Sequence, residues 1–573
     1  MTGGIDARIL GVPLRSRDPF RALVAGGILF LLHAILFRRE QERDLDRAAD
    51  LLRPRAAAIA ALLGLAVAAH GVANGIYSIG GSDAYGYVNQ AYDWRQGLLP
   101  QPIPVRLSLP FEASGRMQAP LGYREGPQRQ TIVPTYAPGL PWIMSASLVF
   151  GACGPFLVVP ICGALFVWLT FRLGVRAGGP SVGLSAAVIL SVSPVVLYQA
   201  VWPMSDIPAG AAWTAATLLA LGNRRRTALL AGAIAAVALV IRPNLLPVAA
   251  VPLVAILFGA RGRECAIRLI AYGSLLLPAI AVIAWLNTLW FGSPANSGYG
   301  SAGELYEVSN IWPNLKLYGG WLMASHTPVV ALALVPLLLL GKSRPNRHVI
   351  LTCFLLCAIT SACYLPYAQF EVWWYLRFFL PAFGAFAVLL AVGITRVGEL
   401  IPAPFGRLIV IAVIVVYATL NLTFARSQEV FGGIRENERR YAAVGEFVAA
   451  SLPANAALVA VQHAGSLRFH SGRLVVRFDF LEHPESARLP QALERLGYQP
   501  FLVIDDAEAG SVRAHFGLPV DSALPWPLRA RMRDLGGVTV YDMAANPSAQ
   551  PPTAIEPSPT RVCDVRRRVL PAR

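Results

Sequence analysis

The hydrophobic residues of this chain fall in long continuous blocks, and the polar residues gather in the stretches between them. Blocks of this kind have neither the period of an amphipathic helix nor that of a half-buried strand, and they are typical of membrane spans. Several blocks are shorter than the roughly 20 residues that cross a bilayer untilted, so we expect their ends to shift by a few residues. The predicted spans are 56–77, 156–175, 181–200, 206–222, 227–242, 245–259, 266–291, 327–341, 349–368, 376–396 and 407–425.

Two further apolar stretches are ambiguous. Residues 22–37 follow basic residues, as the core of a signal peptide does, but Arg38 and Arg39 follow them in place of a small-residue cleavage site. We interpret them as an additional N-terminal helix or a misassigned start. Residues 139–152 are short and carry Trp142 near their beginning, so we expect them to lie along the outer membrane interface.

The pattern changes after residue 425. Short helical and extended segments alternate there, which predicts a small α/β domain: helices at 435–451 and 491–496, and strands at 457–462, 474–477, 500–505 and 538–541. The fold class is therefore an all-α polytopic membrane protein with about eleven transmembrane helices, or twelve with residues 22–37, and an α/β C-terminal domain. The predicted division is an N-terminal segment (1–55), a transmembrane domain (56–425) with a large loop (80–138), the α/β domain (426–545) and a disordered tail (546–573).

Composition agrees with this assignment. Hydrophobic residues make up 55% of the 573 and charged residues only 14%, whereas a soluble chain carries about 25% charged residues. The net charge of +16 could suggest a nucleic-acid partner, but no basic stripe interleaved with aromatic residues is present. The seven cysteines form no disulfide or metal-binding pattern, and we expect free thiols.

The basic residues instead indicate the orientation of the chain. They concentrate in alternate connections, and the short connections between these hold almost none. Because cytoplasmic loops carry the excess of Lys and Arg, this side is predicted to be cytoplasmic. The basic stretches are 38–55, 172–176, 224–226, 261–268, 342–347 and 396–407, and the segments expected outside are 80–138, 202–206, 292–326, 369–377 and everything after 426.

The loop 80–138 opens with a candidate helix. Ser82 or Asp83 suits its start, and Asp83, Tyr87 and Gln90 would then share one face. A carboxylate just outside a membrane span can accept a proton from an acceptor hydroxyl. An ordinary helix cap beside interfacial aromatic residues explains the same residues, and from the loop alone it is the stronger explanation.

A second outward carboxylate, Asp206, stands where a span begins, and a helix cap and a functional acid are about equally good explanations of it. If a divalent cation takes part, Asp83 and Asp206 are the residues that would hold it. No cofactor is otherwise indicated. His326 and His463 have no second ligand at metal-binding spacing, so we expect structural roles for both.

Two outward arginines are candidate phosphate ligands, because a guanidinium fork suits a phosphate or a carboxylate. Arg242 precedes Pro243 and Asn244 at the apex of 227–259, where the prolines predict a break between two helices. Pairing with Asp206 or snorkelling to the interface would also explain Arg242. Trp374 and Arg377 lie in the turn 369–377, where Trp374 suits a sugar-stacking platform or an interfacial anchor.

Six short segments together resemble those of the multispanning C-type glycosyltransferases. They are the first-loop acid in Gly81-Ser82-Asp83, the segment Tyr136-Ala137-Pro138-Gly139-Leu140-Pro141, the turn Met204-Ser205-Asp206-Ile207-Pro208, the apex Arg242-Pro243-Asn244, the stretch Trp373–Arg377 and the segment His463–Gly472. These include protein O-mannosyltransferases, aminoarabinose transferases and related bacterial family 39-like proteins. The resemblance covers roughly residues 56–545.

The resemblance implies an enzyme of the bacterial inner membrane that transfers a sugar from a polyprenyl-phosphate donor to an envelope acceptor (lipid, glycan or protein) at the extracytoplasmic face. It implies Asp83 as base or orienting acid, Asp206 as a second acid and Tyr136 as part of the substrate site. Paired acids are commoner in such proteins, whereas Ala84 follows Asp83 and Ser205 precedes Asp206 here. That difference leaves metal dependence open.

Two other classes remain as alternatives. A secondary transporter or lipid flippase also has broken helices and proline-rich apices, but usually shows an internal repeat and polar residues at mid-membrane. A non-enzymatic envelope scaffold is the third class. No nucleotide-binding loop, nucleophile elbow or zinc-peptidase helix occurs in the sequence, which argues against a cytoplasmic nucleotide-driven enzyme.

Overall fold

The computed structural model describes residues 5–9, 12–16, 36–103, 109–128, 130–339, 346–534, 536–546, 551–556 and 567. The ambiguous stretch 22–37, except its last two residues, lies outside the described residues, and so does most of the tail 546–573. The predictions of an extra N-terminal helix and of a disordered tail therefore remain untested. Within the N-terminal segment, β1 (Ile5–Ile9) and β2 (Val12–Ser16) pair in an antiparallel hairpin that was not predicted.

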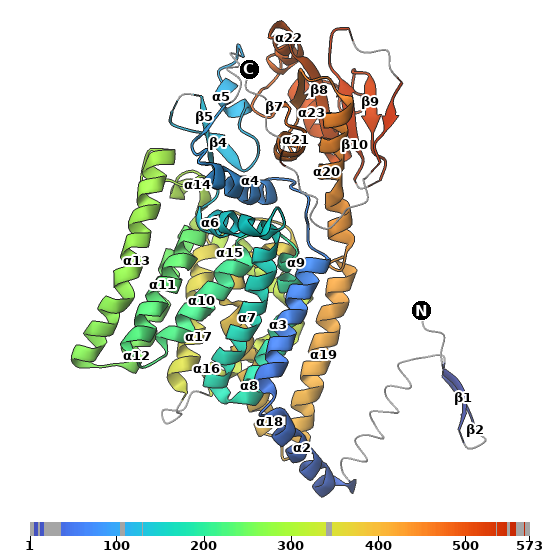
Figure 1. The fold of residues 1–573 in the computed structure, drawn as a ribbon. Helices are drawn as coiled ribbons and strands as arrows, with labels where there is room; N and C mark the ends of the chain where they lie inside the picture. Colours follow the sequence, from blue (N-terminus) through green and yellow to red (C-terminus); the bar gives the residue numbers. More distant parts are fainter. Residues whose placement is uncertain are drawn as a thin grey trace.

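A bundle of helices forms the main body of the molecule (Figure 1). It is linked by the 3₁₀ segments η2 (Pro243–Ala249), η4 (Pro328–Leu334) and η5 (Trp373–Phe379). The helices are α2 (Arg38–Leu52), α3 (Ala56–Ala73), α7 (Gly154–Gly178), α8 (Pro180–Ser191), α9 (Pro194–Ala200), α10 (Asp206–Ala220), α11 (Arg225–Ile241), α12 (Ala250–Gly259), α13 (Gly262–Phe291), α15 (Ile311–His326), α16 (Val335–Leu338), α17 (Arg347–Tyr364), α18 (Leu380–Glu399) and α19 (Phe405–Ser427).

Six of the described helices are long and apolar enough to cross a membrane, or eight if each of two bent pairs is one span. The multispanning helical class is therefore confirmed, and the count of eleven is not. The predicted span 181–200 is two helices, α8 and α9, that meet at 61°. Pro194 begins α9, and a proline cannot continue the hydrogen bonding of a preceding helix.

The predicted outer loop 292–326 is largely helical, which corrects that expectation. It contains α14 (Ala302–Leu305), η3 (Val308–Asn310) and α15, and α15 turns by 112° into η4 and α16. Thr327 makes this turn with a positive φ of 65°. Lys316, Gly319 and Gly320 interrupt the apolar pattern of α15, which is why the sequence did not predict a helix there.

The predicted loop 80–138 is folded. It contains α4 (Asp83–Gln96), β3 (Gln101–Pro102), α5 (Ser114–Met117), β4 (Tyr123–Glu125) and β5 (Thr131–Pro134), and the strands form an antiparallel sheet in the order β3-β5-β4. After it, α6 (Gly139–Ser147) and η1 (Leu148–Phe150) run across the ends of the bundle helices (Figure 1). Val149 and Phe150 are exposed, as suits a segment at a membrane interface.

The C-terminal part lies over the same end of the bundle as α4 and α6 (Figure 1). Its sheet has the order β11-β9-β10-β8-β6-β7, with β6 parallel to β7 and β8, and β10 antiparallel to β8 and β9. The elements are α20 (Gly433–Ser451), β6 (Ala456–Val459), α21 (Ala464–Ser471), β7 (Leu474–Val476), η6 (Ser486–Arg488), α22 (Leu489–Arg495), β8 (Gln499–Asp505), η7 (Asp506–Glu508), α23 (Ala509–Phe516), β9 (Leu528–Arg531), β10 (Val538–Asp542) and β11 (Thr553–Ala554).

Both faces of this sheet are covered. Val444 and Val448 of α20 belong to a core on one face, with α21. On the other face, α22 and α23 share a core with Phe111 and Met117 from the first loop, so the loop is packed onto the C-terminal sheet. Each predicted helix and strand of this part is present within about three residues of its predicted ends.

One cysteine prediction was wrong. Cys162, Cys265, Cys353, Cys357 and Cys363 are free thiols, but Cys153 is disulfide-bonded. Cys153 is the residue that precedes α7, and it is half-buried at the loop end of that helix. It therefore lies outside the apolar interior that led us to expect a free thiol.

Candidate functional site

A cavity of about 1420 Å³ lies where the bundle meets α4 and the C-terminal part. Its lining comes from segments far apart in the sequence: the turn before α4, the loop before α6, the beginnings of α10 and α20, η2, η5 and the second half of α13. A cavity of this size is large enough for a drug-sized ligand or larger.

Asp83 lies at the centre of one polar group in this cavity. Its Oδ2 accepts a hydrogen bond of 3.0 Å from Nη1 of Arg377, and its Oδ1 accepts one of 2.5 Å from the hydroxyl of Tyr136. Burial and the charge of Asp83 raise the pKa of Tyr136, so this hydroxyl stays protonated and keeps donating. Tyr136 is also 2.7 Å from the hydroxyl of Ser82.

Asp206 and Arg242 form a second pair. Asp206 Oδ1 lies 3.0 Å from Arg242 Nη1, yet neither atom makes a well-directed hydrogen bond within the described residues. Their attraction is therefore mainly one of charge, and part of their hydrogen-bonding capacity is left for a ligand. Arg242 is the residue between α11 and Pro243, and its φ of −140° is extended because a residue before proline avoids the helical conformation.

The helix-cap explanation of the two acids does not hold. Each acid is the first residue of its helix, but the preceding serines, Ser82 and Ser205, make no side-chain cap hydrogen bond. The Ser205 hydroxyl lies 2.8 Å from the hydroxyl of Tyr87 instead. Both carboxylates point to guanidinium groups from other elements.

Aromatic rings bring the two guanidinium groups together. The ring of Phe378 lies 5.8 Å from the guanidinium carbon of Arg242 and 5.5 Å from that of Arg377. Tyr364 accepts a hydrogen bond of 3.0 Å from Asn244 and lies 6.0 Å from Arg242. Such cation–π contacts hold both charges at one side of the cavity.

The two carboxylates differ in exposure. The Asp83 side chain is 30% exposed, whereas that of Asp206 is 2% exposed. Both carboxylates line the cavity, but Asp83 is the more accessible of the two.

Eight of the nine predicted site residues line this cavity: Asp83, Tyr87, Tyr136, Asp206, Arg242, Asn244, Trp374 and Arg377. Gln90 does not; it is buried inside α4, and its amide atoms have no hydrogen-bond partner among the described residues. Its spacing from Asp83 and Tyr87 placed it on one helix face, but the next turn of α4 runs into the protein. His326 and His463 do not line the cavity and bond to Ser193 and Asp505, respectively.

The donor set does not fit a resident metal ion. The described residues contain no group of three or more His, Cys, Asp or Glu side chains placed to hold a metal. Asp83 and Asp206, the predicted ligands, are each paired with a guanidinium nitrogen at 3.0 Å.

The fold has a counterpart among solved structures. No known family profile and no curated protein sequence matches the chain. ArnT from Cupriavidus metallidurans bound to undecaprenyl phosphate matches with a TM-score of 0.52 at 13% sequence identity, over 86% of this chain and 99% of that chain. The chain therefore shares the fold of this protein over most of its length. The fold implied by the sequence resemblance is thus confirmed.

Two other structures are more distantly similar to this chain. The Archaeoglobus fulgidus oligosaccharyltransferase tethered to an acceptor peptide has a TM-score of 0.49 at 12% identity, over 86% of this chain and 74% of that one. Mycobacterial arabinofuranosyltransferase AftD has a TM-score of 0.48 at 14% identity, over 86% of this chain and 42% of that one.

Several residues that line the cavity were not predicted from the sequence. Tyr198 stacks on Trp374 with ring centroids 5.6 Å apart and planes 7° apart, and Trp202 lies beside it. A sequence feature could have pointed to both residues: Tyr198 lies just before the turn 202–206, which holds Asp206, and Trp202 begins it. Asn437, Glu438 and Tyr441 of α20 also line the cavity. Nothing local marks them, because they belong to a charged helix more than 350 residues away from Asp83.

Proposed function

We propose that the chain is a membrane glycosyltransferase that moves a hexosyl or pentosyl group from a polyprenyl-phosphate donor to an envelope acceptor (lipid, glycan or protein) at the extracytoplasmic face. The observation that carries this proposal is the accessible Asp83 carboxylate, 3.0 Å from Arg377 in a cavity that also holds Arg242. An acid that can take a proton thus lies beside guanidinium groups that can bind a phosphate. Undecaprenyl phosphate bound to ArnT, which has the same fold, supports a lipid-phosphate donor.

In the proposed reaction, the acceptor hydroxyl gives its proton to Asp83 and its oxygen bonds to the anomeric carbon of the donor sugar. The bond from that carbon to the phosphate oxygen breaks, its electron pair leaves with the polyprenyl phosphate, and the anomeric configuration inverts. Arg377 and Arg242 stabilise the negative charge on this leaving group. The donor already carries its leaving group, so the enzyme needs to position the substrates rather than activate them.

The remaining residues have supporting roles in this proposal. Asp206 orients Arg242, while Tyr136 donates to one oxygen of Asp83 and Arg377 donates to the other, which together orient the carboxylate. Tyr87, Asn244 and Trp374 contact substrate from the cavity wall. Gln90 lies behind that wall and is not part of the proposed site.

The proposed location is the bacterial inner membrane, with the cavity and the C-terminal domain (426–545) outside. Charge alternation along the predicted transmembrane domain (56–425) favours this orientation. The disulfide at Cys153 supports it independently, because disulfides persist in oxidising compartments and Cys153 lies at the cavity end of α7.

We retain eleven spans as part of the proposal. The helices α10 and α11 have 15 and 17 residues, which is short for a membrane span. Both are nevertheless packed inside the bundle, α10 beside α7 and α11 beside α13. Short helices of this kind cross a membrane where neighbours cover their ends.

The test is the substitution Asp83→Asn, which keeps the shape of the side chain and removes the base. Loss of a positioned base lowers transfer by about 10²–10⁴-fold. Glycan products of cells that carry only the variant would be compared by mass spectrometry, with membrane insertion checked by fractionation. Asp521→Asn, at an exposed carboxylate of the C-terminal part, serves as the control and should leave the products unchanged. Unaltered products in the Asp83 variant would contradict the proposal and favour a transporter or flippase.

A further inference from the structure

The charges in the cavity are unevenly distributed. Among the described residues that line it, the basic side chains are Arg242, at the end of α11, and Arg377, on η5. Beyond the acids that pair with them, the cavity has two more acidic side chains, Glu429 and Glu438. Glu429 lies between α19 and α20, and Glu438 lies in the first turns of α20. We define the α20 wall as Gln428, Glu429, Asn437, Glu438 and Tyr441, all of which line the cavity.

Glu429 is held in an unusual conformation at this wall. Its φ of 56° lies in the left-handed region, which a non-glycine residue rarely adopts. A Cβ atom at Gly433 would lie 2.6 Å from Cβ of Glu429 and 2.8 Å from its Oε2. The glycine therefore leaves the space that the Glu429 side chain occupies beside the cavity.

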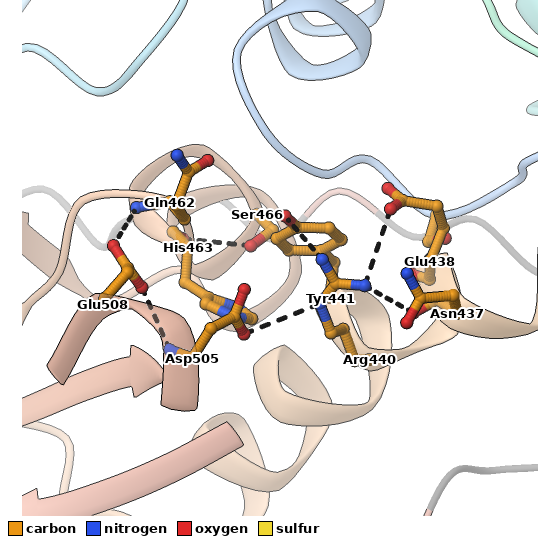
Figure 2. Close-up of polar contacts among 10 residues, drawn as sticks. Asn437, Glu438, Arg440, Tyr441, Gln462, His463, Ser466, Asp505 and Glu508 are labelled. Atoms are coloured by element: carbon orange, nitrogen blue, oxygen red, sulfur yellow. Dashed lines mark hydrogen bonds and ion pairs between the residues drawn. The ribbon is translucent and has the colours of Figure 1, made fainter. Parts of the chain in front are cut away.

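A network of charges behind the wall fixes its other members (Figure 2). Arg440 donates a hydrogen bond of 2.9 Å to the carbonyl of Asn437, and its nitrogens lie 3.6 Å from the carboxylates of Glu438 and Asp505. Asp505, at the end of β8, in turn bonds to His463 at 2.8 Å. The first turns of α20 are thus tied to the sheet of the C-terminal part, and the wall is preorganised.

A buried amide across the cavity lacks a partner. Gln199 is 1% exposed and lines the cavity, and neither its amide nitrogen nor its amide oxygen has a hydrogen-bond partner among the described residues. An unsatisfied buried amide is costly, so it calls for a ligand group that both donates and accepts. A hydroxyl does both.

Tyr198 connects this amide to the α20 wall. It precedes Gln199 on α9, and its ring stacks on Trp374. Tyr198 and Trp374 line the same cavity as Gln199 and the α20 wall. An aromatic face, a free amide and two acidic side chains therefore line one cavity with Asp83.

We propose that the α20 wall and Gln199 form a subsite for a hydroxyl-rich sugar of the acceptor, either uncharged or carrying an amine. This inference rests on the proposed function, because the proposed function assigns Arg242 and Arg377 to the donor phosphate and so leaves the α20 wall for the acceptor. A sugar ring offers an apolar face to Tyr198 and Trp374, and hydroxyls to the amides and carboxylates of the subsite. The exposed Glu429 carboxylate repels anions, so an acidic sugar or a phospholipid headgroup is disfavoured there.

The experiment uses the full-length chain in nanodiscs and reads saccharide binding from intrinsic tryptophan fluorescence, since Trp202 and Trp374 line the cavity. The probes are the neutral saccharides maltotriose, mannotriose and arabinotriose, the amine-bearing glucosamine dimer and the acidic trigalacturonate. We expect at least one neutral or amine-bearing probe to bind, and trigalacturonate to bind at least about tenfold more weakly. Failure of all neutral and amine-bearing probes to bind, or preference for trigalacturonate, would overturn the subsite.

Substitutions in the proposed subsite then test whether the saccharide binds there. Glu429→Gln and Gln199→Leu should each weaken the best probe about tenfold or more, since each loses a hydrogen bond to the sugar. Glu446→Gln, at an exposed carboxylate later on α20, is the matched control and should bind as the parent does. Glu429 is exposed, so its variant keeps the test valid if Gln199→Leu fails to fold. Equal binding by parent and Glu429→Gln would overturn the assignment.

Binding of undecaprenyl phosphate, measured by thermal shift on the same samples, separates the two proposals. We expect it to be unchanged in the Glu429 and Gln199 variants. If it weakens in these variants as much as saccharide binding does, the wall serves the donor and the inference is wrong. If the parent itself does not bind undecaprenyl phosphate, the proposed donor fails, while the saccharide results still decide the subsite.

Discussion

At the residue scale, the site consists of two acids whose local sequence is that of an ordinary helix start. Asp83 and Asp206 each follow a serine and begin a helix, a pattern that indicates capping. The structure pairs them instead with Arg377 and Arg242, which come from η5 and from the break after α11. The sequence nominated all four residues and offered pairing with Asp206 as one explanation of Arg242, which the structure confirms. It did not pair Asp83 with Arg377, which lies 294 positions further along the chain.

The arginines give a first prediction at this scale. Arg377→Lys keeps the charge but loses the planar fork that grips a phosphate at two points. We expect about tenfold weaker binding of undecaprenyl phosphate, measured by thermal shift over a range of lipid concentrations. Arg396→Lys, in the last turn of α18, which follows η5, should bind as the parent does. Equal affinity in the Arg377 variant would exclude bidentate phosphate binding by that residue.

A second prediction concerns pH. Burial raises the pKa of Glu438 from 4.5 to about 7; Arg440 opposes this shift and Asp505 adds to it. The folded chain therefore holds a proton between about pH 4.5 and 7 that the unfolded chain has lost, so this group makes stability fall as pH rises through that window. Glu438→Gln should raise the melting temperature relative to the parent at pH 8 and have little such effect at pH 4.5. A difference independent of pH would contradict the shift, and Glu446→Gln is the exposed control.

At the element scale, breaks in helices build the site. The sequence predicted one of them: α11 ends at Ile241, and Arg242 is released from the helix by Pro243. The break between α8 and α9 was hidden in a continuous apolar run, although Pro194 marks it. Helix α15 was missed for the opposite reason, because its apolar residues are interrupted by Lys316 and two glycines.

Helix α6 gives the prediction at this scale. A Cβ atom at Gly139 would lie 2.5 Å from backbone atoms of Val240 and Ile241, just before Arg242. Gly139→Ala should therefore push α6 away from the apex, lower transfer by tenfold or more and destabilise the fold by about 1–3 kcal/mol. Glycan products and the melting temperature would be measured together. Gly273→Ala is the control, because a Cβ atom at this position of α13 meets open space, and it should lower neither the glycan products nor the melting temperature. Unchanged products and melting temperature in the Gly139 variant would contradict the prediction and mean that the apex at Arg242 tolerates movement.

At the scale of the whole molecule, the cavity exists because three regions meet at one end of the bundle. The first loop packs on the C-terminal sheet through Phe111 and Met117, and α20 returns its first turns to the cavity. The C-terminal part therefore contributes directly to the cavity wall.

Orientation is the prediction at this scale. Asp521→Cys, in the C-terminal part, should react with a membrane-impermeant maleimide in spheroplasts, whereas Arg224→Cys, before α11, should react only after lysis. The reason is the excess of basic residues on the side of Arg224. Labelling is read by mass spectrometry against the parent chain, whose own cysteines give the background. The reverse pattern would place the cavity in the cytoplasm and exclude extracytoplasmic transfer.

Composition and short-range patterns were enough to predict the helical membrane class, the charge asymmetry, the α/β elements after residue 425 and eight residues that line the cavity. The pairing of Asp83 with Arg377, the greater exposure of Asp83 than of Asp206, and the contribution of α20 to the cavity became known from the folded chain. These depend on long-range packing, and nothing in a local pattern records which distant surface will cover it.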